Sequence, residues 1–308
     1  MELISIIIPC FNEEESLIPF HRETKKVIDH MEGTDYEMIF VDDGSCDRTL
    51  ELLRGLQQSD RHCRYISFSR NFGKEAAMYA GLSEAKGDYC VIMDADLQHP
   101  PALLPKMYRA VSMEGYDCCG GKRCGREGDG AVRSFCSRLF YKIGKCLTHM
   151  EMADGYGDFR MMNRNMVNAI LEMKEYNRYM KGIYSFVGFQ TKWIPYENVE
   201  RENGSSKWNM RSLLAYAMEG IFSFSTAPLK LAGLAGGALL LAAVIFLMAR
   251  FIGQMSGIAV MTDFDILLTV ILFLGGMQMM FLYIVGIYLS KDCMENKKRP
   301  LYIVKERR

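Results

Sequence analysis

Two carboxylates and an amide directly follow an apolar segment of this 308-residue chain. The apolar segment is Tyr89–Met93, and Asp94, Asp96 and Gln98 come after it. Five apolar residues that end in acids are typical of a buried parallel strand, and open α/β sheets bind ligands beyond the carboxyl ends of their strands. Carboxylate and amide oxygens suit Mg²⁺ or Mn²⁺, which can hold a diphosphate. An Asp-rich turn that caps the next helix would explain the same residues, so this segment alone leaves both interpretations open.

The elements around this segment predict a doubly wound sheet. Apolar segments predict strands at residues 3–8, 36–41, 64–67 and 89–93, and helical patterns lie between them at about 14–31, 47–58 and 74–85. Alternating strands and helices at this spacing favour an α/β fold with a mostly parallel sheet. We expect Pro9 to end the first strand and Ser45 to cap the second helix. No Gly-x-Gly-x-x-Gly follows the first strand, and no Walker loop is present, which disfavours dehydrogenases and P-loop enzymes.

The amino-acid composition indicates which kind of partner and which cellular compartment to expect. The 37 basic and 37 acidic residues give no net charge, so nothing indicates a nucleic-acid partner. The ten cysteines contain no Cys-x-x-Cys pair, and Cys10 and Cys90 lie within apolar segments. Buried reduced thiols in a cytosolic domain explain this better than disulfides.

Two long uncharged segments lie in the C-terminal third of the chain. Residues 231–249 and 266–290 contain 19 and 25 residues without a charge. Each can cross a hydrocarbon core about 30 Å thick, so we expect two transmembrane helices, at about 229–252 and 266–290. Glycines within both segments allow close helix association, so a homo-oligomer is compatible with the sequence. Buried helices of a soluble protein are the alternative, which two such segments close together disfavour.

The charges beside these segments predict a topology. The loop 251–265 has no Lys or Arg, whereas the tail 291–308 has seven. The positive-inside rule places the tail in the cytoplasm, and two spans bring the N-terminal domain to the same side. We therefore divide the chain into a catalytic domain at 1–208, a juxtamembrane amphipathic helix at 209–228, two spans within 229–290, and a basic tail at 291–308. A second amphipathic segment, Val132–Leu147, fits either a helix in the membrane interface or an ordinary surface helix.

Six motifs occur along the chain in a fixed order. They are Pro9–Glu14, Val41–Ser45, Phe72–Glu75, Asp94–Pro100, Gly157–Arg160 and Arg201–Trp208. The first four together resemble the family 2 glycosyltransferases of the GT-A fold. Within that family the chain is similar to the polyprenyl-phosphate sugar transferases. The last two motifs and the two C-terminal spans fit the bactoprenol glucosyltransferase branch better than dolichyl-phosphate mannose synthase. The resemblance implies a multi-pass protein of the bacterial inner membrane whose catalytic domain is cytoplasmic.

The resemblance also implies roles for the acids. Asp96 and Gln98 would hold Mg²⁺ or Mn²⁺, with Asp94 close to the donor sugar or ribose. Asp158 matches a residue that serves as a base or orients the sugar, and we favour orientation because a phosphate acceptor is already anionic. We expect His99 to pack beside Pro100 rather than to bind the metal.

The remaining site residues would bind the two substrates. The resemblance gives the nucleotide sugar the following donor-binding residues: Pro9, Phe11, Glu13, Asp43, Asp94, Arg201 and Lys207. Phe11 can stack on the base, and Glu13 can accept a hydrogen bond from the base or a sugar hydroxyl. Lys74 can contact phosphate or simply begin a helix, and the sequence does not separate these.

Arg123 and Arg133 match the arginines that bind the acceptor phosphate, for which a guanidinium offers two parallel donors.

The expected function is inverting transfer of a sugar, glucose as first choice, from a UDP-sugar to polyprenyl phosphate. One alternative is a processive polysaccharide synthase, whose Gln-x-x-Arg-Trp pattern is approached only by Gln190–Trp193, without the arginine. Another is a catalytically dead membrane adaptor, a hypothesis that the intact acidic residues of the motifs disfavour.

Overall fold

The computed structural model describes residues 1–124, 156–197 and 263–308, with isolated positions between 229 and 248. The chain forms two compact units, Met1–Ala217 together with Arg299–Arg308, and Met218–Lys298. Several predicted features lie outside the described residues. They are the amphipathic segments 132–147 and 209–228, Arg133, Arg201 and Lys207.

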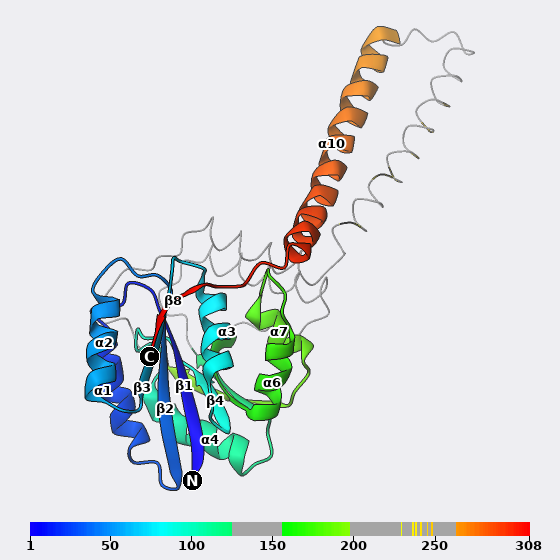
Figure 1. The fold of residues 1–308 in the computed structure, drawn as a ribbon. Helices are drawn as coiled ribbons and strands as arrows, with labels where there is room; N and C mark the ends of the chain where they lie inside the picture. The colour runs from blue at the N-terminus through cyan, green and yellow to red at the C-terminus, as the bar shows by residue number, and fades with distance from the viewer. Residues whose placement is uncertain are drawn as a thin grey trace. The chain divides into compact units, whose positions relative to one another are not determined.

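A mixed sheet of eight strands forms the centre of the first unit (Figure 1). The strands are β1 (Glu2–Cys10), β2 (Thr34–Asp42), β3 (Cys63–Phe68), β4 (Tyr89–Ile92), β5 (Cys118–Cys124), β6 (Tyr156–Asn163), β7 (Thr191–Glu197) and β8 (Val304–Arg307). Their order in the sheet is β7-β5-β6-β4-β1-β2-β3-β8. The four strands β4, β1, β2 and β3 are parallel, and β6 and β8 flank them in the antiparallel direction. The predicted α/β fold with a mostly parallel sheet is confirmed.

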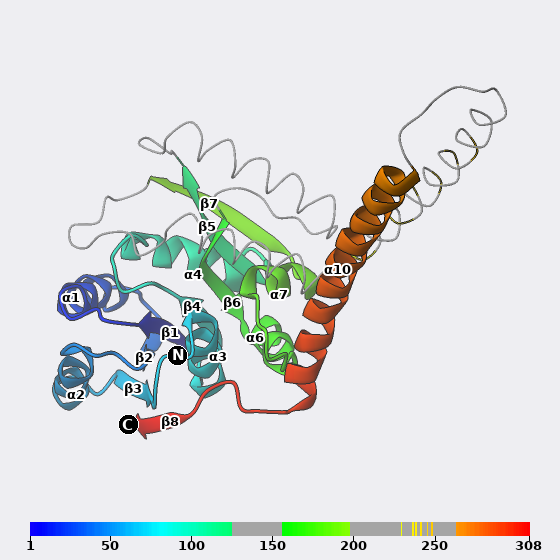
Figure 2. The ribbon, with the colours of Figure 1, turned by 90° about the horizontal axis from the view of Figure 1, so that it is seen from above.

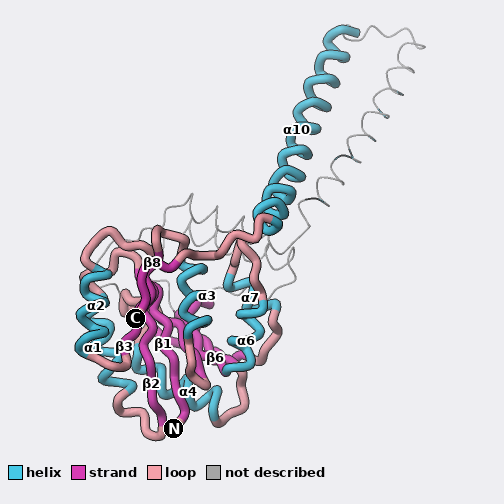
Figure 3. Tube along the Cα trace, in the orientation of Figure 1, coloured by secondary structure: helices cyan, strands magenta, loops and turns pink. Residues whose placement is uncertain are grey.

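Helices cover both faces of the parallel strands, as Figures 2 and 3 show. The described helices of the first unit are α1 (Leu17–Ile28), α2 (Thr49–Ser59), α3 (Lys74–Glu84), α4 (Leu104–Ser112), α6 (Arg164–Glu172) and α7 (Met180–Phe186), with a 3₁₀ turn at Pro101–Leu103. Because both faces are covered, the central strands are apolar almost throughout rather than alternating.

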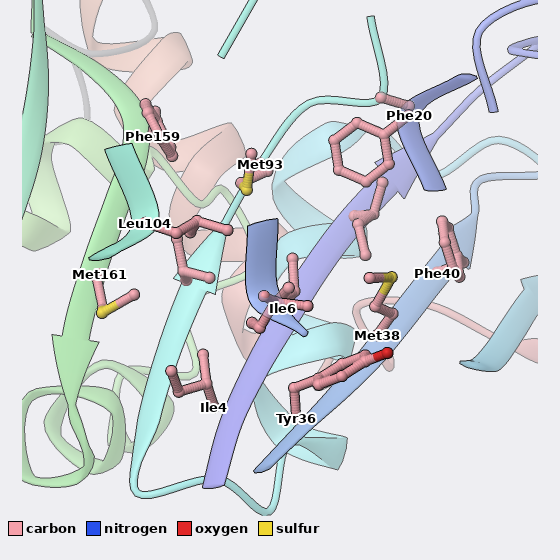
Figure 4. Packing of buried hydrophobic residues seen from close by; sticks show 14 of the residues in the cluster. Ile4, Ile6, Phe20, Tyr36, Met38, Phe40, Met93, Leu104, Phe159 and Met161 are labelled. Carbon is pink, nitrogen blue, oxygen red and sulfur yellow. The ribbon is translucent and has the colours of Figure 1, made fainter. Parts of the chain in front are cut away.

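The two faces of β1 show this double coverage. Ile4 and Ile6 lie in one buried cluster with Phe20 of α1 and Leu104 of α4 (Figure 4). Ile7 points to the opposite face, where a Cβ on Gly81 of α3 would lie 2.3 Å from its Cγ2. A glycine in α3 thus lets this helix approach the strand closely.

Two local predictions at the strand ends are wrong. Pro9 does not end β1, which continues to Cys10. Its missing N–H faces the β4 side, where the ladder has already ended at Ile7 and Ile92, so no hydrogen bond is lost. Ser45 does not cap α2, which begins at Thr49. Its hydroxyl instead accepts the Asn12 N–H at 2.9 Å and joins two strand-end loops.

The C-terminal tail returns to the sheet of the first unit. The tail predicted from charge alone contains β8, which pairs with β3. This strand occupies an edge of the sheet that sequence reasoning left open.

The second unit contains one long described helix, α10 (Asp263–Asn296). Within the described residues, Phe273–Asn296 is the one stretch long and apolar enough to cross a membrane, and it overlaps the predicted second span. The predicted first span lies mostly outside the described residues, so the two-helix hairpin remains a prediction. Gly236, one of the isolated described positions, would place a Cβ 3.1 Å from the Phe281 ring, which indicates a close approach to α10.

Candidate active site

The turn after β4 carries the predicted metal ligands. The Asp96 carboxylate accepts the Gln98 N–H at 3.1 Å, and Leu97 between them has a φ of 58°. This left-handed conformation is unusual for a leucine and marks a tightly constrained turn. The turn carries two oxygen-bearing side chains, those of Asp96 and Gln98, and both residues are half-buried. This donor set fits Mg²⁺ or Mn²⁺.

Lys74 connects two of the predicted catalytic acids. Its Nζ lies 2.7 Å from Asp94 Oδ1 and 3.2 Å from Asp158 Oδ2. Asp94 follows β4, Asp158 lies on the neighbouring strand β6, and Lys74 is the first residue of α3. The structure therefore brings the two acids together and adds a lysine whose role the sequence left open. The sequence signal that could have indicated this role is the position of Lys74 directly after Phe72 and Gly73, in the loop that follows the third strand.

The charges in this cluster stabilise one another. Burial lowers the pKa of Lys74, but Asp94 and Asp158 outweigh burial, so the pKa is raised. Burial raises the pKa of Asp158, but the positive charges of Lys74 and Lys181 outweigh it and hold the pKa below its ordinary value. Asp158 Oδ1 is buried and has no hydrogen-bond donor among the described residues. An ionised acid of this kind is a weak base and a good acceptor for a substrate hydroxyl.

His99, which we expected to pack beside Pro100, packs against the neighbouring strand β6. Its ring stacks on Phe159 at a centroid distance of 4.8 Å, and Nδ1 accepts the Asp94 N–H at 3.0 Å. Burial lowers the pKa of His99. With Nδ1 used as an acceptor, the neutral ring carries its proton on Nε2, 3.9 Å from Asp94 Oδ2. His99 thus holds the backbone of Asp94 through the Nδ1 hydrogen bond.

Asp43, predicted to bind the nucleoside, lies at the end of β2 and orders the β3–α3 loop. Its carboxylate accepts the N–H groups of Phe72 at 2.6 Å and Gly73 at 2.9 Å. Burial raises the pKa of Asp43 to about 6, although these two hydrogen bonds act in the opposite direction and lower it. The residues that Asp43 holds lead directly into Lys74, so the predicted donor residue and the acid–lysine cluster are structurally connected.

The predicted base-binding residues lie in the loop after β1. Glu13 Oε2 accepts the Ser16 hydroxyl at 2.6 Å, and the Glu13 N–H donates to Thr49 Oγ1 at 2.8 Å. Asn12, with a φ of 55°, accepts the Cys46 N–H at 2.9 Å. Phe11 is half-buried beside them. These bonds lock the loops after β1 and β2 together at the carboxyl ends of the strands, where Pro9 and Phe11 also lie.

Arg123, predicted to bind the acceptor phosphate, is an exposed residue of β5 paired with Tyr196 of β7.

The packing of Arg160 gives it a structural role that its sequence motif did not indicate. Its guanidinium lies 3.9 Å from the Tyr184 ring and 5.1 Å from the Trp193 ring, and it donates to the Gly157 carbonyl. Arg160 thus supports the strand that carries Asp158.

A second cluster of metal-ligand types lies at the amino end of β3. His21, Asp60 and Cys63 have ligand atoms within 4.8 Å of one another. Asp60 already forms an ion pair with Lys25 and accepts from the His62 ring. A resident lysine supplies the positive charge there, and this cluster is not the predicted ion site.

Comparisons with known proteins agree with this architecture. The family model described as Glycosyl transferase family 2 matches residues 5–171. A putative glycosyltransferase, CsbB, of Bacillus subtilis is 43% identical over 99% of this chain and 92% of its own length. A prophage bactoprenol glucosyl transferase homolog of Escherichia coli is 38% identical over 98% of each chain. The bactoprenol glucosyl transferase of Shigella phage SfX is 36% identical over 99% of each chain.

Among solved structures, glucosyl-3-phosphoglycerate synthase from Mycobacterium tuberculosis, in a complex with Mn²⁺, UDP-glucose and phosphoglyceric acid, is similar with a TM-score of 0.48 and 19% identity. That match covers 72% of this chain and 78% of the other. The family match spans most of the catalytic sheet, and relatives align over nearly the whole chain. The protein is a glycosyltransferase and belongs to glycosyl transferase family 2.

Proposed function

We propose that this enzyme transfers one hexose, glucose as the first candidate, from a UDP-sugar to a polyprenyl phosphate with inversion at the anomeric carbon. The observation that carries the proposal is the cluster at the carboxyl end of β4 and the amino end of the antiparallel strand β6, where Lys74 bridges Asp94 and Asp158 beside the Asp96–Gln98 turn. The bactoprenol glucosyl transferases that align over nearly the whole chain support the acceptor class.

The reaction is a single displacement. An oxygen of the acceptor phosphate forms a bond to the anomeric carbon, the bond from that carbon to the donor diphosphate breaks, and the nucleoside diphosphate leaves with the electron pair. The acceptor is already anionic at neutral pH, so no proton has to be removed. This chemistry needs cations for the phosphates and groups that orient the sugar.

The described residues meet these needs in different ways. Asp96 and Gln98 would hold Mg²⁺ or Mn²⁺, which when bound neutralises charge on the leaving diphosphate. Asp158, kept ionised by Lys74 and Lys181, would orient sugar hydroxyls through Oδ1, which has no hydrogen-bond partner among the described residues. Asp43 after β2, together with Pro9, Phe11 and Glu13 at the end of β1 and in the loop that follows it, would bind the nucleoside.

A donor screen tests the proposal. The purified full chain is given Mn²⁺ or Mg²⁺ and a short polyprenyl phosphate with UDP-glucose, UDP-N-acetylglucosamine or GDP-mannose, and products are read by mass spectrometry. We expect one hexose on the lipid phosphate and none on the matching polyprenol, which lacks the phosphate. Transfer of many sugars to one acceptor would favour a polysaccharide synthase, and no turnover of any donor would favour a dead adaptor.

Arg133 is proposed to bind the acceptor phosphate together with Arg123. Arg133→Ala should raise KM for the lipid phosphate about tenfold or more and leave KM for the donor nearly unchanged, because the lost contact is to the acceptor. Steady-state kinetics with each substrate varied in turn provide the measurement. An equal change in both KM values would move Arg133 out of the acceptor site.

We also propose that the enzyme is anchored in the bacterial inner membrane with its catalytic domain in the cytoplasm, as the charge pattern predicts. A cysteine at Ser256 in a cysteine-free background should then react with impermeant maleimide in intact cells. A cysteine at Lys305, which is exposed, should react only after lysis. Glu306 is unsuitable because it contacts Arg54 and Tyr65. The reverse labelling pattern would place the catalytic domain away from cytosolic nucleotide sugars.

A further inference from the structure

The C-terminal segment Tyr302–Arg308, called here the C-terminal strap, is bound to the strand that leads into the active-site loop. In β8, Arg307 pairs with Ile66 and Val304 pairs with Phe68. Beyond the strand, the Ser69 N–H donates to the Ile303 carbonyl at 2.9 Å. The backbone ladder of the strap therefore reaches the first residue of the loop 69–73.

Aromatic contacts extend this connection along the loop. The Tyr302 ring stacks on Phe68 at 4.8 Å, and Phe68 meets the edge of Phe72 at 5.8 Å. The Arg70 guanidinium lies 4.1 Å from the centre of the Phe72 ring on its face. A row of three aromatic side chains thus runs from the strap to Phe72, whose ring is held by its neighbours.

Phe72 is also a residue that contacts the site directly. Its N–H and that of Gly73 donate to Asp43, and the next residue is Lys74, which bridges Asp94 and Asp158. A displacement of Phe72 would therefore change the surroundings of the Asp43 carboxylate and the start of the helix that presents Lys74.

Polar contacts also fix the strap at Glu306, at Arg307 and at Tyr302, whose hydroxyl lies 3.4 Å from the Ser83 hydroxyl of α3. Glu306 accepts hydrogen bonds from Arg54 and from the Tyr65 hydroxyl, and Arg307 donates to Glu84 at 3.1 Å. These contacts lie on β3, α2 and α3, so the strap is attached to the elements on both sides of the loop 69–73.

We propose that Tyr302 is a positioning residue of the active site, through which the C-terminal strap holds the loop 69–73 in the conformation that presents Asp43 and Lys74. The positioning of the loop is a property of the fold, whereas its effect on the donor rests on the proposed function. The strap is then more than a cover for the edge of β3, because its loss changes substrate affinity as well as stability.

Amide hydrogen exchange on the full chain tests the positioning without any ligand. Tyr302→Ala should accelerate exchange at residues 69–73 about tenfold, Tyr302→Leu less, and Tyr302→Phe hardly at all. The matched control is Tyr108→Ala, since Tyr108 forms an edge-on pair with Tyr89 at 5.5 Å beside the amino end of β4. It should leave exchange at 69–73 unchanged. Unaltered exchange at 69–73 in Tyr302→Ala, or equal acceleration in the control, would overturn the proposal.

Binding of UDP in the presence of Mn²⁺, measured by calorimetry, tests the effect on the site. We expect Kd to rise about tenfold in Tyr302→Ala, to recover in Tyr302→Phe, and to stay unchanged in Tyr108→Ala. Wild-type Kd in Tyr302→Ala, despite faster exchange in the loop, would limit the strap to a structural role. Absence of UDP binding by the wild type would instead contradict the proposed donor, and hydrogen exchange would still decide whether Tyr302 positions the loop.

Discussion

Asp96→Ala should reduce sugar transfer by about a thousandfold or more while the protein stays folded. Asp96 is half-buried at the carboxyl end of β4, and its substitution removes an oxygen donor from the proposed metal site but no side chain from the core. The measurement is initial rate over a range of Mn²⁺ and Mg²⁺ concentrations, with circular dichroism to confirm the fold.

Asp88→Ala is the matched control, because Asp88 is an exposed acid at the other end of the same strand. Its carboxylate accepts the Leu3 N–H at 2.9 Å, far from the proposed metal ligands, and Asp88→Ala should keep nearly full activity. If Asp96→Ala turned over at the wild-type rate with the same metal dependence, the metal assignment at this turn would be wrong.

Lys74→Met should lower kcat by about a hundredfold, because two acids would then face each other without the cation between them. The substitution keeps the length and the apolar stem of the side chain. Lys74 is 40% exposed, so screening by water makes the expected loss in thermal stability small. Steady-state kinetics and thermal unfolding of the same samples measure the two effects separately.

Lys106→Met provides the comparison, since Lys106 is an exposed lysine of α4 away from the acids. A large loss of stability in Lys74→Met with unchanged kcat would make the lysine a purely structural ion-pair partner. Lys74→Arg, which retains the charge but changes its geometry, should recover part of the activity.

The strands of the sheet were predictable because burial on both faces leaves a strong apolar signal. β1, β2, β3 and β4 appear within one or two residues of their predicted limits at nearly every end. The two errors, at Pro9 and Ser45, arose because rules for single residues were applied without knowledge of the neighbouring strands and loops. Pro9 is tolerated because its position in the ladder needs no donor, and Ser45 bonds a distant loop rather than the nearest helix.

The acids of the site were predictable for a different reason, since each ends a strand or lies in a recognisable motif. The ion pairs between them were not, because Lys74, Asp94 and Asp158 come from separate elements and meet only when the sheet is assembled. Arg160 illustrates the same limit. Its motif drew attention to the segment, but only the packing of Tyr184 and Trp193 shows that it supports the strand.

β8 could not be predicted from its sequence. Val304–Arg307 contains one apolar residue and three charged ones, which is typical of a solvated tail. It is a strand because the edge of β3 offers unpaired backbone groups. Its shortness and charge suit an outer strand, since they discourage pairing with another molecule.

This arrangement has a consequence for the order in which the protein is made. Tyr65 and its partner Glu306 are 241 residues apart, so the edge of β3 stays open until the ribosome has added the residues of the strap. Strand pairing over so long a separation closes late in folding, after the local βα units have formed. A chain that ends before the strap would leave that edge exposed to other newly made chains. Premature termination near the C-terminus should therefore be seen first as aggregation during synthesis, because the open edge can pair before any enzyme is assembled.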